Sequence, residues 1–380
     1  MSVAEPGIPA IEPTAEMAAA TNPTAVVTPF PHGPSAWSDD AGLWVRDGGE
    51  PPRLLVAEPH VWTGRDPIIS PDGQWVGFIV SVDDQQGTFS SEFRVVSWTD
   101  GTLRQTVVGD RLGVEDLAGS NERRGVLTPV WSPDSRMIAF DTISAADDAR
   151  PHSYDDLWTL EVGTGKITRV LDEGEAGTFV FSPDGSMFAV ATAGYFGSDH
   201  PSVVKVLRTD GSGERDLFSH PLVILHEEGY ASDKLQWAPD GRSILLTLPA
   251  PQAGEELLDV RWPTAQLYRL PLDGKPELLA TVKDVVGGAY GIEWSPDAQH
   301  TAYVVTTADP SAATATGDAS YPRPAPMRDL IIAGPDGTRG QTVTRAPNLN
   351  FVGWLPDSQH FRYSRQTATE LSEVTVGELP

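Results

Sequence analysis

The sequence predicts an all-β protein in which one four-stranded unit is repeated around a ring. Three observations support this: an aromatic-rich turn motif that recurs six times, an Asp-Gly turn that recurs between the copies, and 36 Gly and 33 Pro in 380 residues. The motif aspartates lie 50 to 62 residues apart, a spacing typical of repeat architectures. The copies read IISPDGQWVGF from Ile68, VWSPDSRMIAF from Val130, VFSPDGSMFAV from Val180, QWAPDGRSILL from Gln236, EWSPDAQHTAY from Glu293 and GWLPDSQHFRY from Gly353.

Each motif copy is interpreted as a strand, a turn and a second strand. The residue before the serine position is large and apolar in every copy, which suits the end of a buried strand. Proline presets the first turn position, aspartate accepts backbone N–H groups, and glycine or a small or polar substitute takes the strained position. Ala238 and Leu355 replace the motif serine in two copies, so the motif indicates scaffold rather than hydroxyl chemistry. The apolar residues are Ile69, Trp131, Phe181, Trp237, Trp294 and Trp354.

A second turn downstream supplies the other half of each unit. Asp-Gly between alternating apolar runs is a strong hairpin signal, so a third and a fourth strand are expected around it. Four-stranded sheets repeated radially form a β-propeller. The turns are TDGT at Thr99, GTGK at Gly163, TDGS at Thr209, LDGK at Leu272 and PDGT at Pro335.

The W-S-P-D-G and Asp-Gly pattern resembles the PD40, or TolB-like, β-propeller repeat over residues Trp37 to Pro380. It is also similar to the N-terminal propeller of prolyl-oligopeptidase-type enzymes. The resemblance implies a propeller. It departs from both relatives, because neither the α/β domain that precedes the propeller of TolB nor the hydrolase domain of the peptidases is expected here.

Six blades are expected, with seven as the alternative. The last repeat begins at Asn350 and is short, so its outer strands are expected from Gly42–Val56, which would close the ring and remove an open edge. Leu371–Val376 also has a strand pattern, which leaves open which segment pairs first.

Residues 1–36 are rich in Pro, Ala and Thr and are expected to form a flexible tether before the propeller of residues 37–380. The stretch PTAVVTP is typical of linkers in exported bacterial proteins, and no signal peptide is present in the sequence. The expected location is extracytoplasmic (periplasm, cell envelope or secreted), with a cytoplasmic location as the alternative. Docking of the tether on a neighbouring ring would be a route to self-assembly.

Charge and composition limit the partners. A formal net charge of −26 argues against nucleic acid or an anionic membrane as the main partner. No apolar run approaches membrane-spanning length, so direct membrane insertion is not expected. With no Cys, the chain has no disulfide, thiolate metal ligand or cysteine nucleophile. The charge keeps the protein soluble, and an acidic face would also favour a basic partner or a cation.

The long and variable loops are expected on one face of the ring, opposite the two recurring turn types. Long loops on a rigid scaffold commonly carry function, and Tyr and Arg are frequent anchors of protein interfaces. Three loops, 144–156, 194–201 and 308–327, are therefore predicted to bind another protein. The candidate contact residues are Asp147, Asp148, His152, Tyr154, Asp155, Tyr195, His200, Tyr321 and Arg323.

Signals for catalysis and cofactors are missing from the sequence. There is no G-x-S-x-G elbow or phosphate loop, HEEGY at His226 lacks a second zinc-binding His, and the paired aspartates lack calcium-loop spacing. We expect no metal site and no cofactor. The predicted function is a non-enzymatic protein-interaction scaffold. The alternative is a small-molecule or carbohydrate site at the central channel, with hydrolase or lyase activity left open, for which the candidates are Thr128, Thr178, Gln236 and Glu293.

Overall fold

The computed structural model describes residues 34–58, 66–83, 89–109, 112, 123–145, 156–192, 202–220, 235–250, 264–287, 291–307, 327–355, 357–365 and 373–379 of the chain. Its named elements in these ranges are twenty-six β-strands. The prediction of an all-β protein is confirmed. Within the described ranges, no helix has the length and apolar character needed to cross a membrane.

The strands form seven antiparallel sheets, here called sheets 1 to 7. Sheet 1 contains β1 (Pro34–Asp39), β2 (Gly42–Asp47) and β3 (Arg53–Ala57). Sheet 2 contains β4 (Ile68–Ile69), β5 (Trp75–Asp83), β6 (Phe89–Ser97) and β7 (Leu103–Val108). Sheet 3 contains β8 (Arg123–Trp131), β9 (Met137–Ala145), β10 (Leu157–Glu161) and β11 (Ile167–Leu171). Sheet 4 contains β12 (Gly177–Phe181), β13 (Met187–Thr192), β14 (Ser202–Arg208) and β15 (Arg215–His220).

The remaining sheets follow the same order. Sheet 5 contains β16 (Leu235–Trp237), β17 (Ser243–Pro249), β18 (Ala265–Pro271) and β19 (Glu277–Val282). Sheet 6 contains β20 (Ile292–Trp294), β21 (Thr301–Thr306), β22 (Met327–Ala333) and β23 (Gln341–Pro347). Sheet 7 contains β24 (Leu349–Trp354), β25 (His360–Arg365) and β26 (Glu373–Glu378). Sheets 2 to 6 thus each have the four strands that the repeat predicted.

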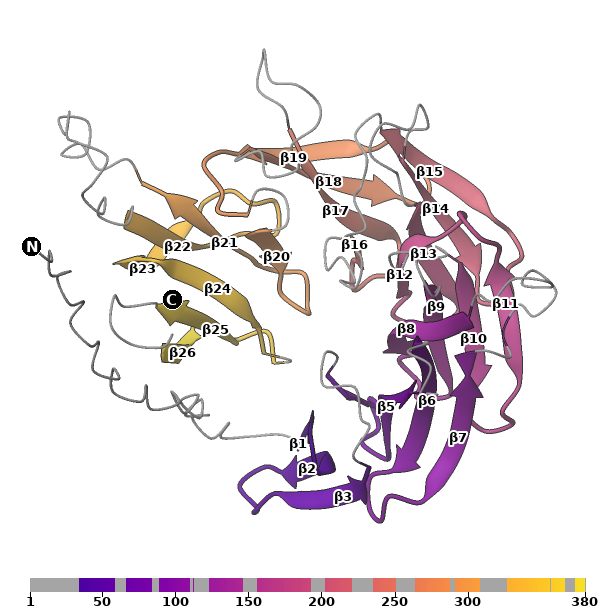
Figure 1. The fold of residues 1–380 in the computed structure, drawn as a ribbon. Helices are drawn as coiled ribbons and strands as arrows, with labels where there is room; N and C mark the ends of the chain where they lie inside the picture. The colour runs from indigo at the N-terminus through magenta and orange to yellow at the C-terminus, as the bar shows by residue number, and fades with distance from the viewer. Residues whose placement is uncertain are drawn as a thin grey trace, which may run out of the picture.

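The sheets follow one another around a ring in chain order, with β8, β12, β16 and β20 toward its centre (Figure 1). Six clusters of buried side chains join successive sheets, each cluster drawing residues from two neighbours. Seven sheets in an open series have six such interfaces. Among the described residues, no cluster joins sheet 7 back to sheet 1, so the apolar core runs through the ring as an open series.

The predicted count of six blades is not confirmed, because the described residues form seven sheets. The predicted closing pairing is not what the structure shows: β2 pairs with β1 and β3 inside sheet 1, and β25 pairs with β24 and β26 inside sheet 7. Leu371–Val376 overlaps β26, and this segment fills the position that Gly42–Val56 was expected to take. β1 begins at Pro34, within the last residues of the expected tether, and the rest of that segment lies outside the described residues.

The turn motif folds as predicted. In sheet 3, Ser132 Oγ donates to Asp134 at 2.7 Å and accepts the backbone N–H of Met137 at 2.9 Å, and Asp134 also accepts the N–H of Arg136 at 3.1 Å. The same three bonds recur in the other serine-containing copies, at Asp72, Asp184 and Asp297. The serine and aspartate therefore satisfy the backbone of the turn between the first and second strands.

The motif tryptophans form hydrogen bonds, most of them to the neighbouring sheet. Three of them donate their indole N–H to a first-strand carbonyl in the preceding sheet: Trp131 to Ile68 at 3.3 Å, Trp237 to Val180 at 3.2 Å and Trp354 to Glu293 at 3.4 Å. Trp294 instead donates within its own sheet, to Pro335, at 2.9 Å. At that interface the Gln236 side chain donates across to the carbonyl of Ser295 at 3.0 Å. Each tryptophan combines apolar packing with one directional bond.

Serine in place of the motif glycine adds a further bond between sheets. Ser135 and Ser358 occupy the left-handed region, with φ of 62° and 57°, which costs a residue with a side chain about 1–2 kcal/mol. Their hydroxyls accept the backbone N–H of the motif aspartate in the preceding sheet, Asp72 at 3.0 Å and Asp297 at 2.9 Å. The hydrogen bond offsets the backbone strain.

Replacing Ser135 by Ala and by Gly should therefore change the free energy of unfolding by different amounts. Ser135→Ala keeps the strained φ and loses the bond to Asp72, so it should lower the free energy of unfolding by about 1 kcal/mol. Ser135→Gly loses the same bond but relieves the strain and should be close to neutral. Chemical denaturation of both variants measures this. Equal destabilisation by the two replacements would contradict the idea that the hydrogen bond to Asp72 offsets the backbone strain at Ser135.

Candidate binding site at the channel mouth

A cavity of about 780 Å³ lies where the first strands converge. Its wall is formed by β12, β16, β20 and β24, together with Val130 of β8 and the motif prolines of sheets 4, 5 and 6. The prolines place the cavity at the end of the channel that carries the motif turns. The variable loops start from the opposite end, because strands that run antiparallel alternate their connections between the two faces.

Three of the four predicted channel residues line this one cavity: Thr178, Gln236 and Glu293. The rest of the wall is apolar or aromatic, with Phe179, Phe181, Trp237, Trp294 and Trp354 among its residues. The side-chain amide of Gln236 donates a hydrogen bond to the carbonyl of Ser295, so its amide oxygen remains an acceptor. Apolar walls with a few convergent polar groups are typical of ligand pockets.

The fourth predicted channel residue, Thr128, does not line the cavity. It is buried in β8 at a break in the pairing with β9, between Leu127 and Val130. Its φ of 40° is unusual for a β-branched residue, and its hydroxyl has no hydrogen-bond partner in the described structure. Thr128 therefore lies apart from the other three predicted channel residues, in a strand whose Val130 does line the cavity.

The turn bonds hold two motif aspartates whose pKa values are lowered. The Ser182 hydroxyl, followed by the backbone and side chain of Ser186, lowers the pKa of Asp184 to about 2. In sheet 7, where Leu355 replaces the motif serine, the side chain of His360 and then its backbone N–H lower the pKa of Asp357 to about 2. Both carboxylates are turn acceptors, and their lowered pKa values have a structural cause.

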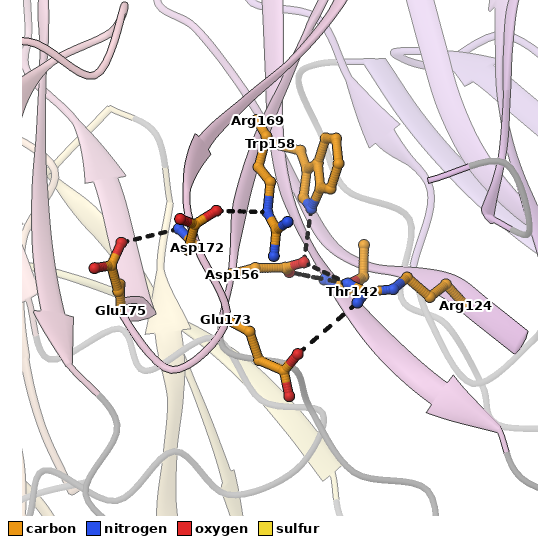
Figure 2. Close-up of polar contacts among 8 residues, drawn as sticks. All are labelled: Arg124, Thr142, Asp156, Trp158, Arg169, Asp172, Glu173 and Glu175. Atoms are coloured by element: carbon orange, nitrogen blue, oxygen red, sulfur yellow. Dashed lines mark hydrogen bonds and ion pairs between the residues drawn. The ribbon is translucent and has the colours of Figure 1, made fainter. Parts of the chain in front are cut away.

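A buried polar network lies at the base of the variable-loop face (Figure 2). Arg124 of β8 and Asp156, just before β10, are both fully buried and form an ion pair at 2.9 Å. Asp156 also accepts the N–H of Thr142 at 2.9 Å and the indole N–H of Trp158 at 2.7 Å, and Arg124 lies 3.9 Å from Glu173. The network joins β8 and β9 to the residue directly before β10. Sequence reasoning missed it, although an acidic residue directly before a buried strand was a signal.

The predicted loop contacts lie outside the described residues: Asp147, Asp148, His152, Tyr154, Asp155, Tyr195, His200, Tyr321 and Arg323. The binding role of these residues stays a prediction. In the described ranges, no three His, Cys, Asp or Glu side chains gather in a group that could hold a metal ion.

Comparison with known proteins identifies the fold. No protein-family model and no curated protein matches the sequence. Among solved structures, an oligogalacturonate lyase from Vibrio parahaemolyticus matches with a TM-score of 0.55 and 13% identity, over 89% of this chain and 83% of that one. The β-propeller domain of the Trilobed protease from Pyrococcus furiosus, described as having an open velcro topology, matches with a TM-score of 0.52 and 11% identity, over 83% and 80%.

TolB from Acinetobacter baumannii matches with a TM-score of 0.40 and 15% identity, over 80% of this chain and 62% of that one. At these identities the likeness concerns the fold alone, and it rests on the two higher-scoring structures. The chain is a β-propeller, the fold that the PD40 and TolB-like resemblance implied.

The turn bonds predict a pH dependence. The pKa of Asp184 falls from the ordinary 3.8 to about 2 on folding, so the folded state favours the ionised carboxylate. Its stabilising contribution is present above pH 3.8 and is lost as the pH falls toward 2. Ser182→Ala removes the largest cause and should raise the pKa of Asp184. Carbon-detected NMR titration of the carboxyl group measures it, and an unchanged pKa in the variant would contradict this assignment.

The buried network predicts a large stability effect. Asp156→Ala removes the buried carboxylate that lies 2.9 Å from Arg124, and breaking a buried ion pair in this way should lower the free energy of unfolding by about 3–5 kcal/mol. The matched control is Arg136→Ala, which breaks an exposed ion pair and leaves the turn hydrogen bonds of Asp134 in place. Arg136 is 85% exposed and its 3.8 Å pair with Asp134 should contribute at most about 1 kcal/mol. Thermal and denaturant unfolding of these variants give the comparison.

Proposed function

We propose that this protein is a non-enzymatic binding module whose channel mouth receives a donor-rich, positively charged group of a partner protein. The cavity lining is the observation that supports this. Its polar groups in the described structure, Thr178, Gln236 and Glu293, present acceptor oxygens, and its one ionisable side chain is an acid. A ligand that donates hydrogen bonds and carries positive charge is complementary to this wall.

Binding is favoured over catalysis by what the described wall contains. General acid–base catalysis commonly uses positioned titratable groups, and covalent catalysis needs a nucleophile with an adjacent base. The described lining provides Glu293 without a second titratable side chain, and the hydroxyl of Thr178 has no His or Lys beside it in that lining. By contrast, the large aromatic and apolar surface of this wall suits binding, because a bound side chain or short peptide segment would bury it.

A small carbohydrate remains the second candidate, because a fold neighbour is an oligogalacturonate lyase. Oligogalacturonate is a polyanion, which normally needs Arg, Lys or a metal ion to balance its carboxylates. The described cavity lining contains no Arg or Lys. A neutral sugar fits this wall better than an acidic one.

The wider setting stays a proposal. The net charge of −26 would attract a basic partner and repel nucleic acid. An extracytoplasmic location follows from the resemblance and from the composition of the first residues, and binding through the variable loops would add to binding at the channel mouth. Self-assembly is the remaining prediction for the ring.

Two exposed valines allow a sharp test. Val352 lines the cavity and is 43% exposed, whereas Val376 lies on β26 outside the cavity lining and is 46% exposed. Val352→Arg should obstruct the channel mouth with a positive charge, while Val376→Arg adds the same charge elsewhere. The probe is a short blocked peptide of alternating Arg and Leu, and the readouts are its dissociation constant by calorimetry and the shift in melting temperature.

We expect the peptide to bind and stabilise the unaltered chain and Val376→Arg, and to lose at least about tenfold in affinity with Val352→Arg, a change of about 1.4 kcal/mol. Equal weakening in both variants would mean that only the net charge attracts the peptide, and would contradict the site. Stabilisation by oligogalacturonate in place of the peptide would move the function to the acidic-carbohydrate candidate.

A further inference from the structure

A second cavity, of about 510 Å³, opens between sheets 6 and 7 on the face that carries the motif turns. Its wall is built from the ends of strands. His300 stands directly before β21, Gln359 directly before β25 and Leu379 directly after β26, while Arg339 belongs to the turn that leads into β23. The cavity is therefore separate from the channel mouth, whose wall is made by first strands.

The polar side chains of this wall are hydrogen-bond donors or can act as donors. Arg339 is exposed and supplies a guanidinium, and the exposed Gln341 and Gln359 supply amide groups. The amide nitrogen of Gln359 lies 3.5 Å from the carbonyl of Ser358, so it is held only weakly. No Asp or Glu belongs to the described part of the lining. In a chain of net charge −26, this wall is a local exception that favours an anion.

His300 is held in a fixed place in the wall. Its ring packs against Trp354, with centroids 6.3 Å apart, and its backbone N–H donates to the hydroxyl of Ser295 at 3.0 Å. Its Nδ1 atom is buried and has no hydrogen-bond partner in the described structure, so Nε2 is the ring nitrogen that a ligand can reach. The imidazole donates from Nε2 when it is protonated there, whether the ring is neutral or charged.

The carboxylates close to these donors serve their own turns. Asp336 accepts the backbone N–H of Thr338 at 3.0 Å and its hydroxyl at 2.8 Å. These two bonds lower the pKa of Asp336, and Arg339 adds a smaller effect in the same direction. Asp297 accepts the N–H of Gln299 at 3.0 Å. Both carboxylates lie outside the described lining of the cavity, which leaves the wall without an acceptor of negative charge.

An equivalent cavity between sheets 2 and 3 has a different charge pattern. The positions correspond, because Val162 donates its N–H to the carbonyl of Arg136 and Leu379 donates to that of Gln359, both at 2.9 Å. The cavity between sheets 2 and 3 has a volume of about 570 Å³. Its lining combines two arginines with three carboxylates: Arg104, Arg136, Asp72, Asp134 and Glu161. The carboxylates would repel an anion there, so the position in the repeat does not by itself make an anion site.

We propose that the cavity between sheets 6 and 7 binds a carboxylate carried on a short aliphatic chain. The planar guanidinium of Arg339 matches the two oxygens of a carboxylate, and Nε2 of His300 would donate a further hydrogen bond. Ile332 and Leu379 lie in the wall and belong to the core cluster that joins sheets 6 and 7, so they offer apolar surface to the aliphatic part. A free dicarboxylate and the glutamate side chain of a partner protein share this chemistry.

The test titrates the full chain, labelled with ¹³C in its histidines, with glutarate and follows the imidazole signals by NMR. The signal that disappears in His300→Gln identifies His300, and we expect it to shift to saturation in the unaltered chain. Arg339→Gln should weaken glutarate binding at least about tenfold, because a charge-assisted pair is lost. The matched control is Arg136→Gln, which removes the same charge from the equivalent cavity and should leave the affinity unchanged.

A second variant separates charge from geometry. Arg339→Lys keeps the positive charge but loses the planar fork, so its affinity should fall between those of the unaltered chain and Arg339→Gln. Because Arg339 is exposed, all these arginine variants should keep the melting temperature of the unaltered chain. Calorimetry with His300→Gln, which retains Arg339, should also show weaker binding of glutarate.

Three results would overturn the proposal. The first is no saturable shift of the His300 signal with glutarate. The second is equal affinity in the unaltered chain and in Arg339→Gln. The third is an equal shift with sulfate at the same ionic strength, which would mean an adventitious ion only.

A blocked glutamate, N-acetylglutamate methylamide, distinguishes the two sources of the carboxylate. Binding as tight as that of glutarate would assign the site to a side chain of a partner protein, and binding of glutarate alone would assign it to a free dicarboxylate. Either result supports the carboxylate site. Glutarate and the Arg–Leu peptide carry opposite charges and are measured at different cavities, so failure here is distinguishable from failure of the proposed function.

Discussion

The structure depends on apolar contact between neighbouring sheets. Each sheet has two faces to cover, and in a ring each face is covered by the next sheet, as the six clusters that span pairs of sheets show. The large apolar residue at the end of each first strand contributes most directly. For Trp131, Trp237 and Trp354 the indole N–H also reaches a carbonyl of the preceding sheet, so burial and register are set by the same side chain.

The candidate site is a consequence of this packing. First strands that converge on one centre bring together side chains from residues more than fifty positions apart, and Thr178, Gln236 and Glu293 meet around one cavity for that reason. One of them also serves the scaffold, since Gln236 bonds to the next sheet where Trp294 does not. The channel wall and the contact between sheets therefore cannot be varied independently at that position.

The carboxylates with lowered pKa values illustrate why a shifted pKa does not by itself indicate catalysis. Asp184 and Asp357 are held ionised by turn hydrogen bonds, from Ser182 in one case and His360 in the other. The deeply buried charges, Arg124 and Asp156, likewise pair with each other and join β8 to the residue directly before β10. In this protein strong polar interactions build the scaffold, and the proposed binding surface depends on moderate, acceptor-rich polarity within an aromatic wall.

The sequence by itself determined the repeat, the two turn types and the four-stranded unit, because turn chemistry and strand periodicity are local. It did not determine the number of sheets or the pairing at the two ends of the chain. Gly42–Val56 and Leu371–Val376 have equally good strand patterns, and only packing decides which edge each one meets. The position of Thr128 and the partner of Asp156 were decided the same way, by a break in β8 and by a buried arginine 32 residues earlier in the chain. Such contacts join residues distant in sequence, and their energies depend on burial that exists only once the ring has formed.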